Sequence, residues 1–477
     1  MSNPNVLLLV LDSVRAANTS VNNSSVTTTP FLSSFANNAT NYTQARAPST
    51  WSLPSHVSIF TGEHAHSHGV ISTTNRLRAG HSIFEELSKD GYSTGVFSDN
   101  PFLVETTHGL KNGFDHVESG RAVKFKDGLN PVQFVIDHGV GHYAEFLKAC
   151  LKHDKPLKSI ANGVNWKLED VGPKIPLFPN TTLSKGTEFV EPFFGWVDSQ
   201  TEPWAACVNL MDAHTPYEPT ELVEGDETLV SLRERIDNYV WDFYAEQQPW
   251  WLLKAMEPLY NDSIRDADKA VNQLINELKQ RGLFDETLIV ITSDHGEGFG
   301  EQSEVSPTHR IVGHGRFAAE ELLHVPLVVK YPEQTTGSVN RELSTLTAFP
   351  SVVRAVRNDA AASFATPNGA YASVSPGDLH MIPNRYQQLI DTKPFEVATK
   401  VVYEQHNDEI QKVMKRGSEA ATWNVTEWGK WKVSADASDV DVKTRFKSVQ
   451  TESLTDGEGQ QEYNDATLNR LRELGYA

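Results

Sequence analysis

Three side chains of metal-ligand type lie just beyond the ends of two short apolar runs. Asp12 directly follows the run 5–11, and Asp294 and His295 follow the run 288–292 after one serine. Both runs are rich in aliphatic residues, as is typical of buried parallel strands. The carboxyl ends of such strands meet at the sheet edge where ligands bind. We therefore predict that Asp12, Asp294 and His295 hold one divalent metal ion.

Ser52 is the candidate nucleophile. Pro54 suits the first turn of a helix and Gly62 its end, so Ser52 is expected at a helix N-terminus. Backbone N–H groups and the helix dipole favour an anion at that position. A hydroxyl there, facing a metal ion, is set up to attack a tetrahedral oxyanion ester.

Further polar residues are expected near the same sheet edge. His214 follows the apolar run 204–210, and His56 lies in the first turn of the nucleophile helix. Asn100 follows the strand-like run 92–98 and is a candidate substrate contact. An equally good interpretation makes Asn100 a turn initiator before Pro101. We take His56 and Asn100 as substrate-binding candidates.

The elements that position these residues predict an α/β fold. Four runs are predicted to be strands of a central, mostly parallel sheet flanked by helices: 5–11, 92–98, 204–210 and 288–292. The segment 262–281 has its apolar residues at helical spacing and ends at Gly282, so it predicts an amphipathic helix leading into the last of these strands.

The order of these motifs resembles the sulfatase branch of the alkaline phosphatase superfamily. That branch has a first strand ending in a metal-binding Asp, a Cys/Ser-x-Pro-x-Arg nucleophile motif closed by Thr-Gly, a His-x-Pro-like turn and a late Asp-His or Asp-Asn pair. The matching residues, in chain order, are Asp12, Ser52, Pro54, Thr61, Gly62, His214, Pro216, Asp294 and His295. Within that branch, the chain resembles archaeal sulfatase-like hydrolases with serine at the nucleophile position.

The resemblance implies roles for two more histidines. His214 would bind an ester oxygen, and His314 would contact the oxygen of the leaving group. His309 and His324 compete with His314 for that role. The histidines of the segment 64–68 read as a structural turn, with a ligand site as the alternative.

The resemblance also implies a division into two parts. Residues 1–340 would form the sulfatase-like catalytic domain. Residues 341–477 would form a smaller C-terminal α+β subdomain with antiparallel strands, since they hold short β-type segments with polar spacers. The segment 120–200 carries no readable motif and is expected to shape the substrate pocket.

Three departures from the family pattern bear on the chemistry. Ser13 stands where a second Asp is usual, His56 where Arg is usual and His295 where Asn is frequent. One imidazole and fewer carboxylates shift the expected metal from Ca²⁺ toward Mn²⁺ or Zn²⁺, with Mg²⁺ as a further candidate. Sulfatases need formylglycine, made from Cys or Ser, whereas an unmodified Ser52 favours phosphate chemistry because a phosphoserine can be released by water.

Three functions stay open at this point. The first is a metal-dependent sulfatase-family hydrolase that cleaves a sulfate ester through a modified Ser52. The second is a phosphodiesterase, a phosphonate monoester hydrolase or a phosphoglycerol-type transferase that uses Ser52 unmodified. The third is a non-catalytic binding protein on the same scaffold. For the enzymes we expect a small-molecule or glycan ester as substrate and no organic cofactor.

Composition excludes several other classes. The 477 residues carry a formal net charge of −20, which argues against a nucleic-acid partner and against docking on an anionic membrane. No apolar run reaches membrane-spanning length, and no signal segment precedes the first strand, so we expect a cytoplasmic protein. The two cysteines form no disulfide framework. The acidic composition leads us to hypothesise a halophilic archaeal source. The sequence makes no prediction of the oligomeric state.

Overall fold

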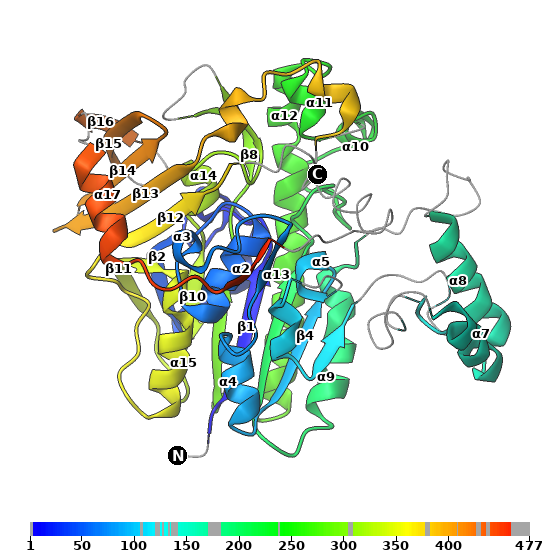
Figure 1. The fold of residues 1–477 in the computed structure, drawn as a ribbon. Helices are drawn as coiled ribbons and strands as arrows, with labels where there is room; N and C mark the ends of the chain where they lie inside the picture. The colour runs from blue at the N-terminus through cyan, green and yellow to red at the C-terminus, as the bar shows by residue number, and fades with distance from the viewer. Residues whose placement is uncertain are drawn as a thin grey trace.

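The computed structural model describes residues 3–458, except 105–107, 120–124, 126–127, 132–133, 135–141, 170–182, 237–238, 304–308, 377–381, 408, 426–430 and 436–438. Within these residues the chain forms one large sheet between layers of helices and a second, smaller sheet (Figure 1).

The large sheet has eight strands in the order β11-β2-β10-β7-β1-β6-β4-β5. Its centre is β1 (Asn5–Leu11), which pairs in parallel with both β6 (Trp204–Leu210) and β7 (Thr287–Thr292). All other neighbours are parallel except at β10, which runs antiparallel to β7 and β2. The outer strands are β4 (Ser93–Ser98), β5 (His116–Glu118), β10 (Leu327–Lys330), β2 (Thr40–Arg46) and β11 (Ser338–Thr345). The predicted mostly parallel α/β sheet is confirmed.

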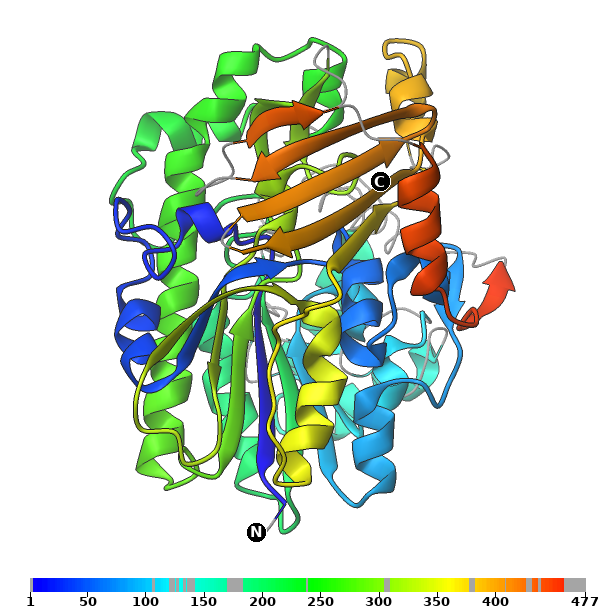
Figure 2. The same ribbon diagram turned by 90° about the vertical axis from the view of Figure 1, so that its left-hand side faces the viewer.

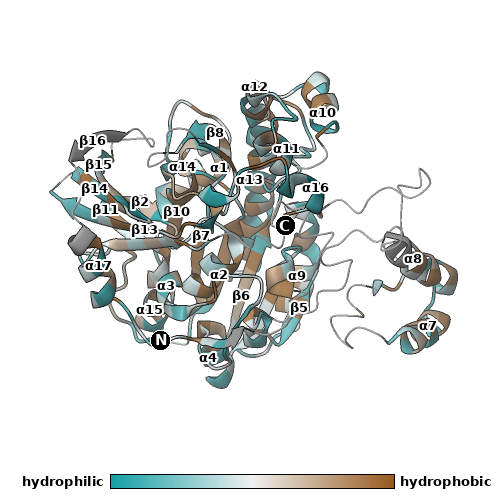
Figure 3. Cartoon of the chain, turned by 45° about the horizontal axis from the view of Figure 1, so that its top comes forward, coloured by the Kyte–Doolittle hydropathy of each residue, from teal (hydrophilic) through white to brown (hydrophobic). Residues whose placement is uncertain are grey.

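The central strands are mostly apolar, with polar residues at or near their ends, because helices cover both faces of the sheet. Val6, Leu8 and Val10 of β1 point into one core, together with α2 (Ser52–Thr61) and α4 (Ile83–Lys89). The alternating residues of β1 point into the opposite core. There they pack with the long helix α13 (Glu257–Gln280), which is the amphipathic helix predicted for 262–281, and with α1 (Pro30–Phe35) and α9 (Val190–Val197). Figures 2 and 3 show the helices on either side and the mostly hydrophobic central strands.

The smaller sheet is antiparallel and C-terminal, as predicted. Its order is β12-β13-β14-β15-β16, formed by Ala370–Val374, Thr399–His406, Glu409–Arg416, Glu419–Val425 and Trp431–Ala435. The helix α17 (Asp439–Ser448) packs on it through Val442 and Phe446. The strand β11 crosses residue 340, the division proposed between 1–340 and 341–477, and pairs with β2 of the large sheet. The large sheet therefore draws one strand from across that division.

A buried ionic cluster joins the two sheets. Glu320, in α14 (Glu320–Leu323), lies 3.2 Å from Nη2 of Arg46 in β2 and 3.2 Å from Nζ of Lys412 in β14. The three residues are no more than 1% exposed. Tyr403 of β13 also donates a hydrogen bond to Glu320. These ionic contacts join β14 of the smaller sheet to α14 and to β2 of the large sheet.

Candidate active site

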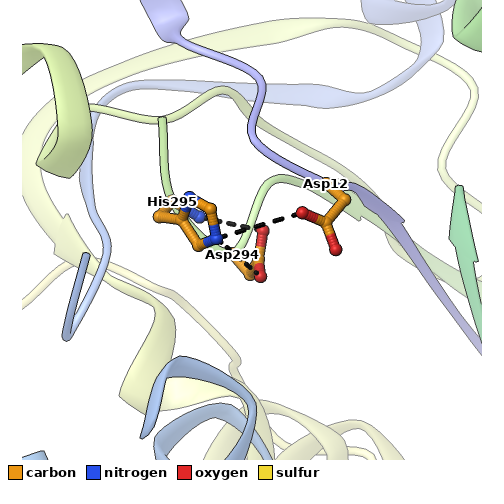
Figure 4. A group of neighbouring side chains, drawn as sticks. All are labelled: Asp12, Asp294 and His295. Carbon is orange, nitrogen blue, oxygen red and sulfur yellow. Dashed lines mark hydrogen bonds and ion pairs between the residues drawn. The ribbon is translucent and has the colours of Figure 1, made fainter. Parts of the chain in front are cut away.

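The three predicted metal ligands converge at the carboxyl edge of the large sheet. Leu11 of β1 lies opposite Leu210 of β6, and Val10 lies opposite Thr292 of β7, so the three strand ends are level. Asp12 follows β1, and Asp294 and His295 follow β7. One ligand atom from each lies within 4.8 Å of the others, and all three side chains are fully buried (Figure 4).

The donor atoms of this group fit a cation. His295 Nδ1 is 2.8 Å from the carbonyl oxygen of Gly296, which can only accept, so in a neutral ring Nδ1 carries the hydrogen. The lone pair of Nε2 then faces Asp294 Oδ2 at 3.4 Å and Asp12 Oδ1 at 3.9 Å. Asp294 Oδ2 accepts no hydrogen bond from the described residues. Lone pairs that meet in a buried place need a positive charge between them, and this mixed oxygen and nitrogen set suits a divalent ion.

Asp12 is held as a carboxylate by its neighbours. Burial alone would raise its pKa, but the charges of His214, His295 and His56 and a hydrogen bond from Asn209 lower the pKa to about 2. Asn209 Nδ2 donates to Asp12 Oδ2 at 3.1 Å. A ligand that stays ionised is available to a metal across the whole physiological pH range.

Ser52 lies against the metal ligands. It is the first residue of α2, which ends at Gly62, a residue with a φ of 81° that a side chain would strain. The Ser52 hydroxyl is 3.3 Å from His295 Nε2 and 3.5 Å from Asp12 Oδ2. The predicted helix therefore brings the predicted nucleophile to the predicted metal group.

The two substrate-binding candidates contact the site's own residues. Asn100 Nδ2 donates to Asp12 Oδ2 at 3.0 Å. His56 Nδ1 is 2.9 Å from the carbonyl oxygen of Ser52 and 3.5 Å from Asp294 Oδ2. Both side chains are fully buried. In this arrangement they orient the ligands and the start of the nucleophile helix, so a substrate contact stays a prediction for both.

The two catalytic histidine candidates lie beside the metal group. The ring of His314 is centred 4.5 Å from the ring of His295 and 5.0 Å from the ring of His214. Of its competitors, His324 is 2.9 Å from the carbonyl oxygen of Thr43 in β2, and His309 stacks beside Phe317 at 6.3 Å. The geometry therefore favours His314.

Sequence reasoning missed three residues that the fold brings to the site. Asn209 is the polar residue next to the end of the apolar strand β6. The Ser13 hydroxyl donates to Asp12 Oδ1 at 3.1 Å. Glu297 Oε1 lies 3.3 Å from His314 Nδ1. Their place in the sequence could have indicated them, because each residue lies within two positions of a strand end or of a predicted metal ligand. Their partners come from elsewhere in the chain or from a backbone turn, which spacing alone does not reveal.

The segment expected to shape the pocket is anchored at the site. Asp99, beside Asn100, accepts hydrogen bonds from Ser119 Oγ at 3.0 Å and from the backbone N–H of Ser184 at 2.7 Å. Ser119 directly precedes the segment 120–200, and Ser184 lies within it. The described parts of the segment include α7 (Tyr143–Lys152) and α8 (Pro156–Glu169), drawn apart from the large sheet in Figure 1. The carboxylate of Asp99 therefore ties the start of the segment to a second point at Ser184.

A family comparison agrees with this architecture. The model of the family described as Sulfatase matches residues 4–357, which is more than half of the chain. The chain belongs to the sulfatase family. The family predicted from the ordered motifs is thereby confirmed.

Curated relatives of this sulfatase-family chain carry the names of sulfatases. It is 21% identical over 361 residues to an ulvan-active sulfatase of Formosa agariphila, an alignment that covers 73% of this chain and 61% of that protein. It is 23% identical over 381 residues to an N-acetylglucosamine-6-O-sulfatase of Bacteroides thetaiotaomicron, covering 72% of this chain and 65% of that protein. The chain thus spans less than two thirds of either relative.

A solved structure confirms the fold of this sulfatase-family protein. The phosphonate monoester hydrolase of Agrobacterium radiobacter superposes with a TM-score of 0.57 at 16% identity, covering 88% of this chain and 89% of that one. At that identity the likeness shows the fold alone. Within the described residues, no helix combines the length and the apolar character needed to cross a bilayer.

Proposed function

We propose that this protein is a metal-dependent hydrolase that cleaves a sulfate ester of a small molecule or a glycan. The observation that carries the proposal is the position of the Ser52 hydroxyl, 3.3 Å from His295 Nε2 and 3.5 Å from Asp12 Oδ2. A nucleophile at the start of a helix and against a metal group is the arrangement that attack on an oxyanion ester needs. The sulfatase relatives support sulfate as the leading ester class.

The residues take the following roles. Asp12, Asp294 and His295 hold the divalent ion, which supplies positive charge for the ester oxygens when it is bound. The oxygen at position 52 forms the new bond to sulfur or phosphorus, and the bond from that atom to the leaving oxygen breaks. His214 binds an ester oxygen, and His314 gives a proton to the departing oxygen. His56 fixes the helix start through the Ser52 carbonyl group.

A second candidate function is the hydrolysis or transfer of a phosphate or phosphonate ester by Ser52 as it stands. Serine at the nucleophile position, together with His56 in place of the usual arginine, favours this candidate. A sulfate ester of unmodified serine would be a stable end product. A phosphoserine is released when water attacks phosphorus, so unmodified serine permits turnover.

The first experiment is peptide mass spectrometry across Ser52, on protein purified from its native host. Loss of two hydrogens at Ser52 means formylglycine, and sulfate ester hydrolysis is then expected. An intact serine makes the phosphate ester candidate the leading one.

A panel of aryl sulfate, phosphodiester and phosphonate esters then separates the functions. Each ester is assayed with and without added Mn²⁺, and the active class identifies the reaction. Equal silence on all three classes, with metal present, would contradict both enzyme proposals and leave the non-catalytic binding protein.

A further inference from the structure

Glu297 and His314 form a buried pair at the end of a short hairpin. The carboxylate oxygens of Glu297 lie 3.3 and 3.4 Å from His314 Nδ1. The carboxylate of Glu297 is inaccessible to solvent, and His314 is 4% exposed. The pair lies beside the metal group, because His314 packs against the ring of His295.

The hairpin holds the two residues opposite each other. Its strands β8 (Gly298–Gln302) and β9 (Arg310–Gly313) are antiparallel, and Gly298 faces Gly313. Glu297 precedes Gly298 and His314 follows Gly313, so they are the next facing residues. A Cβ at Gly298 would lie 2.8 Å from the carbonyl oxygen of Gly313, and Gly313 has a φ of 62°. Gly298 therefore permits a close approach that a side chain would block, and Gly313 adopts a φ that a side chain would strain.

The carboxylate of Glu297 is also held by its own backbone surroundings. The N–H of Gly298 donates to Glu297 Oε1 at 3.2 Å, and Arg15 donates to the Glu297 carbonyl oxygen. Arg15 also pairs with Glu301 at 2.8 Å. Glu297 is thus an immobile acceptor, which is what a group that orients another side chain must be.

A carboxylate at Nδ1 decides which nitrogen of His314 meets the substrate. An ionised carboxylate only accepts hydrogen bonds, so beside ionised Glu297 the Nδ1 atom of His314 carries a hydrogen and donates it to the carboxylate. Nε2, on the other side of the ring, is then the nitrogen left for the reaction.

We propose that Glu297 is a positioning residue that holds His314 with Nε2 directed to the oxygen of the leaving group. When the bond from sulfur or phosphorus to that oxygen breaks, its electron pair stays on the oxygen, which takes a proton from Nε2. That proton comes from the attacking hydroxyl group at position 52, which gives it to Nε2 of the neutral ring as its oxygen bonds to sulfur or phosphorus. The ring begins and ends neutral, with Nδ1–H donating to Glu297 throughout. The inference rests on the proposed ester hydrolysis, and it assigns a role to a residue two places beyond the metal ligand His295.

The kinetic test uses E297Q, which keeps the shape of the side chain and removes its charge. A control is E277Q, since Glu277 is a partly exposed carboxylate of α13 that pairs with Arg281 and contacts none of the site residues. For an ester with an alkyl alcohol as leaving group, we expect E297Q to lower kcat/KM about 100-fold, because such a group needs a proton. For a nitrophenyl ester we expect a loss of less than about 3-fold, because that group leaves as a stable anion. E277Q should follow the wild type on both esters.

The H314A variant completes a double-mutant cycle. H314A should show the same dependence on the leaving group, and E297Q/H314A should be no slower than H314A alone. Equal losses on all leaving groups, or losses that multiply in the double variant, would overturn the positioning role and leave a structural one. If E297Q fails to fold, E297D keeps the charge one methylene further away and is expected to fall between E297Q and the wild type.

A measurement independent of activity separates this inference from the proposed function. The ¹⁵N chemical shifts of labelled histidines report which ring nitrogen carries the hydrogen, and H314A assigns the signal of His314. We expect an Nδ1–H form in the wild type and a changed signal in E297Q. An Nε2–H form in the wild type would overturn the inference even for an active enzyme. An Nδ1–H form in a protein silent on every ester would remove only the function.

Discussion

Two buried charge clusters in this molecule are built in opposite ways. At the junction of the sheets, the carboxylate of Glu320 lies between two cations, Arg46 and Lys412, each 3.2 Å away. At the end of β1 and β7, the ion-pair partners of Asp12 and Asp294 among the described residues are imidazoles, and Asp294 Oδ2 accepts no hydrogen bond from these residues. The first cluster contains the permanent positive charges of Arg46 and Lys412, whereas in the second the positive charge comes from titratable imidazoles or from a bound ion.

The difference separates a structural cluster from a functional one. Burial would raise the pKa of Glu320, but the charges of Arg46 and Lys412 lower it to about 2. Such a cluster stabilises one arrangement of the two sheets, and its charges are already neutralised by one another, so it does not attract a charged ligand. Converging lone pairs next to a helix N-terminus are poorly stabilised without a ligand, which is why this geometry favours a metal and an anionic ester.

The largest effect is expected from Ser52→Ala at the functional cluster. Loss of the nucleophile should lower kcat/KM more than about 1000-fold under either ester hypothesis. The fold should be unharmed, since the change removes one oxygen. Steady-state kinetics on the active ester and a thermal melt measure both quantities. A variant with more than a tenth of wild-type activity would contradict the assignment of the nucleophile.

Metal removal is expected to act on the functional cluster alone. Asp294→Asn should weaken metal binding and lower activity about 100-fold, because it removes a charged ligand. A free metal concentration of 100 times the Kd should add about 2.7 kcal/mol to the free energy of unfolding, and a chelator should remove that gain. Metal content and melting temperature are measured before and after dialysis against chelator. The control Glu320→Gln should retain the metal content of the wild type.

Breaking the structural cluster should lower stability and leave the chemistry intact. Arg46→Met leaves Glu320 with one cation fewer and should cost about 3–5 kcal/mol of unfolding free energy. The triple variant R46M/E320L/K412M removes all three charges and should regain most of that loss. Urea unfolding measures the stability and kcat/KM the activity. Similar instability of the single and triple variants would show that the charges are not the cause.

The smallest effect is a pH dependence at the edge of the structural cluster. Burial and the charge of Arg46 lower the pKa of His324 to about 3, from about 6.5 in an unfolded chain. Between these values only the unfolded chain binds the proton, so stability falls as pH falls, by about 1.4 kcal/mol per pH unit. His324→Gln should reduce the loss between pH 6 and pH 5 by up to that amount in urea unfolding. Identical slopes for both proteins would refute the shift.

Much of the catalytic layout followed from local patterns. The run 5–11 ends in Asp12 because a strand covered by helices on both faces must be apolar until it reaches the sheet edge. Pro54 and Gly62 similarly indicated the helix that begins at Ser52. Short-range rules sufficed because each of these residues is placed by its own element.

The sequence by itself determined the family, the strands and helices that carry the candidate residues, and the type of metal ligand. Only the tertiary structure decided which residues from other elements contact the candidate residues. Asn209 reaches Asp12 because β6 lies beside β1, and Glu297 reaches His314 because two glycines let a hairpin close. Residues 46, 320 and 412 form one ionic cluster only after both sheets have folded. These contacts join residues from separate elements, and no sequence period encodes such distances.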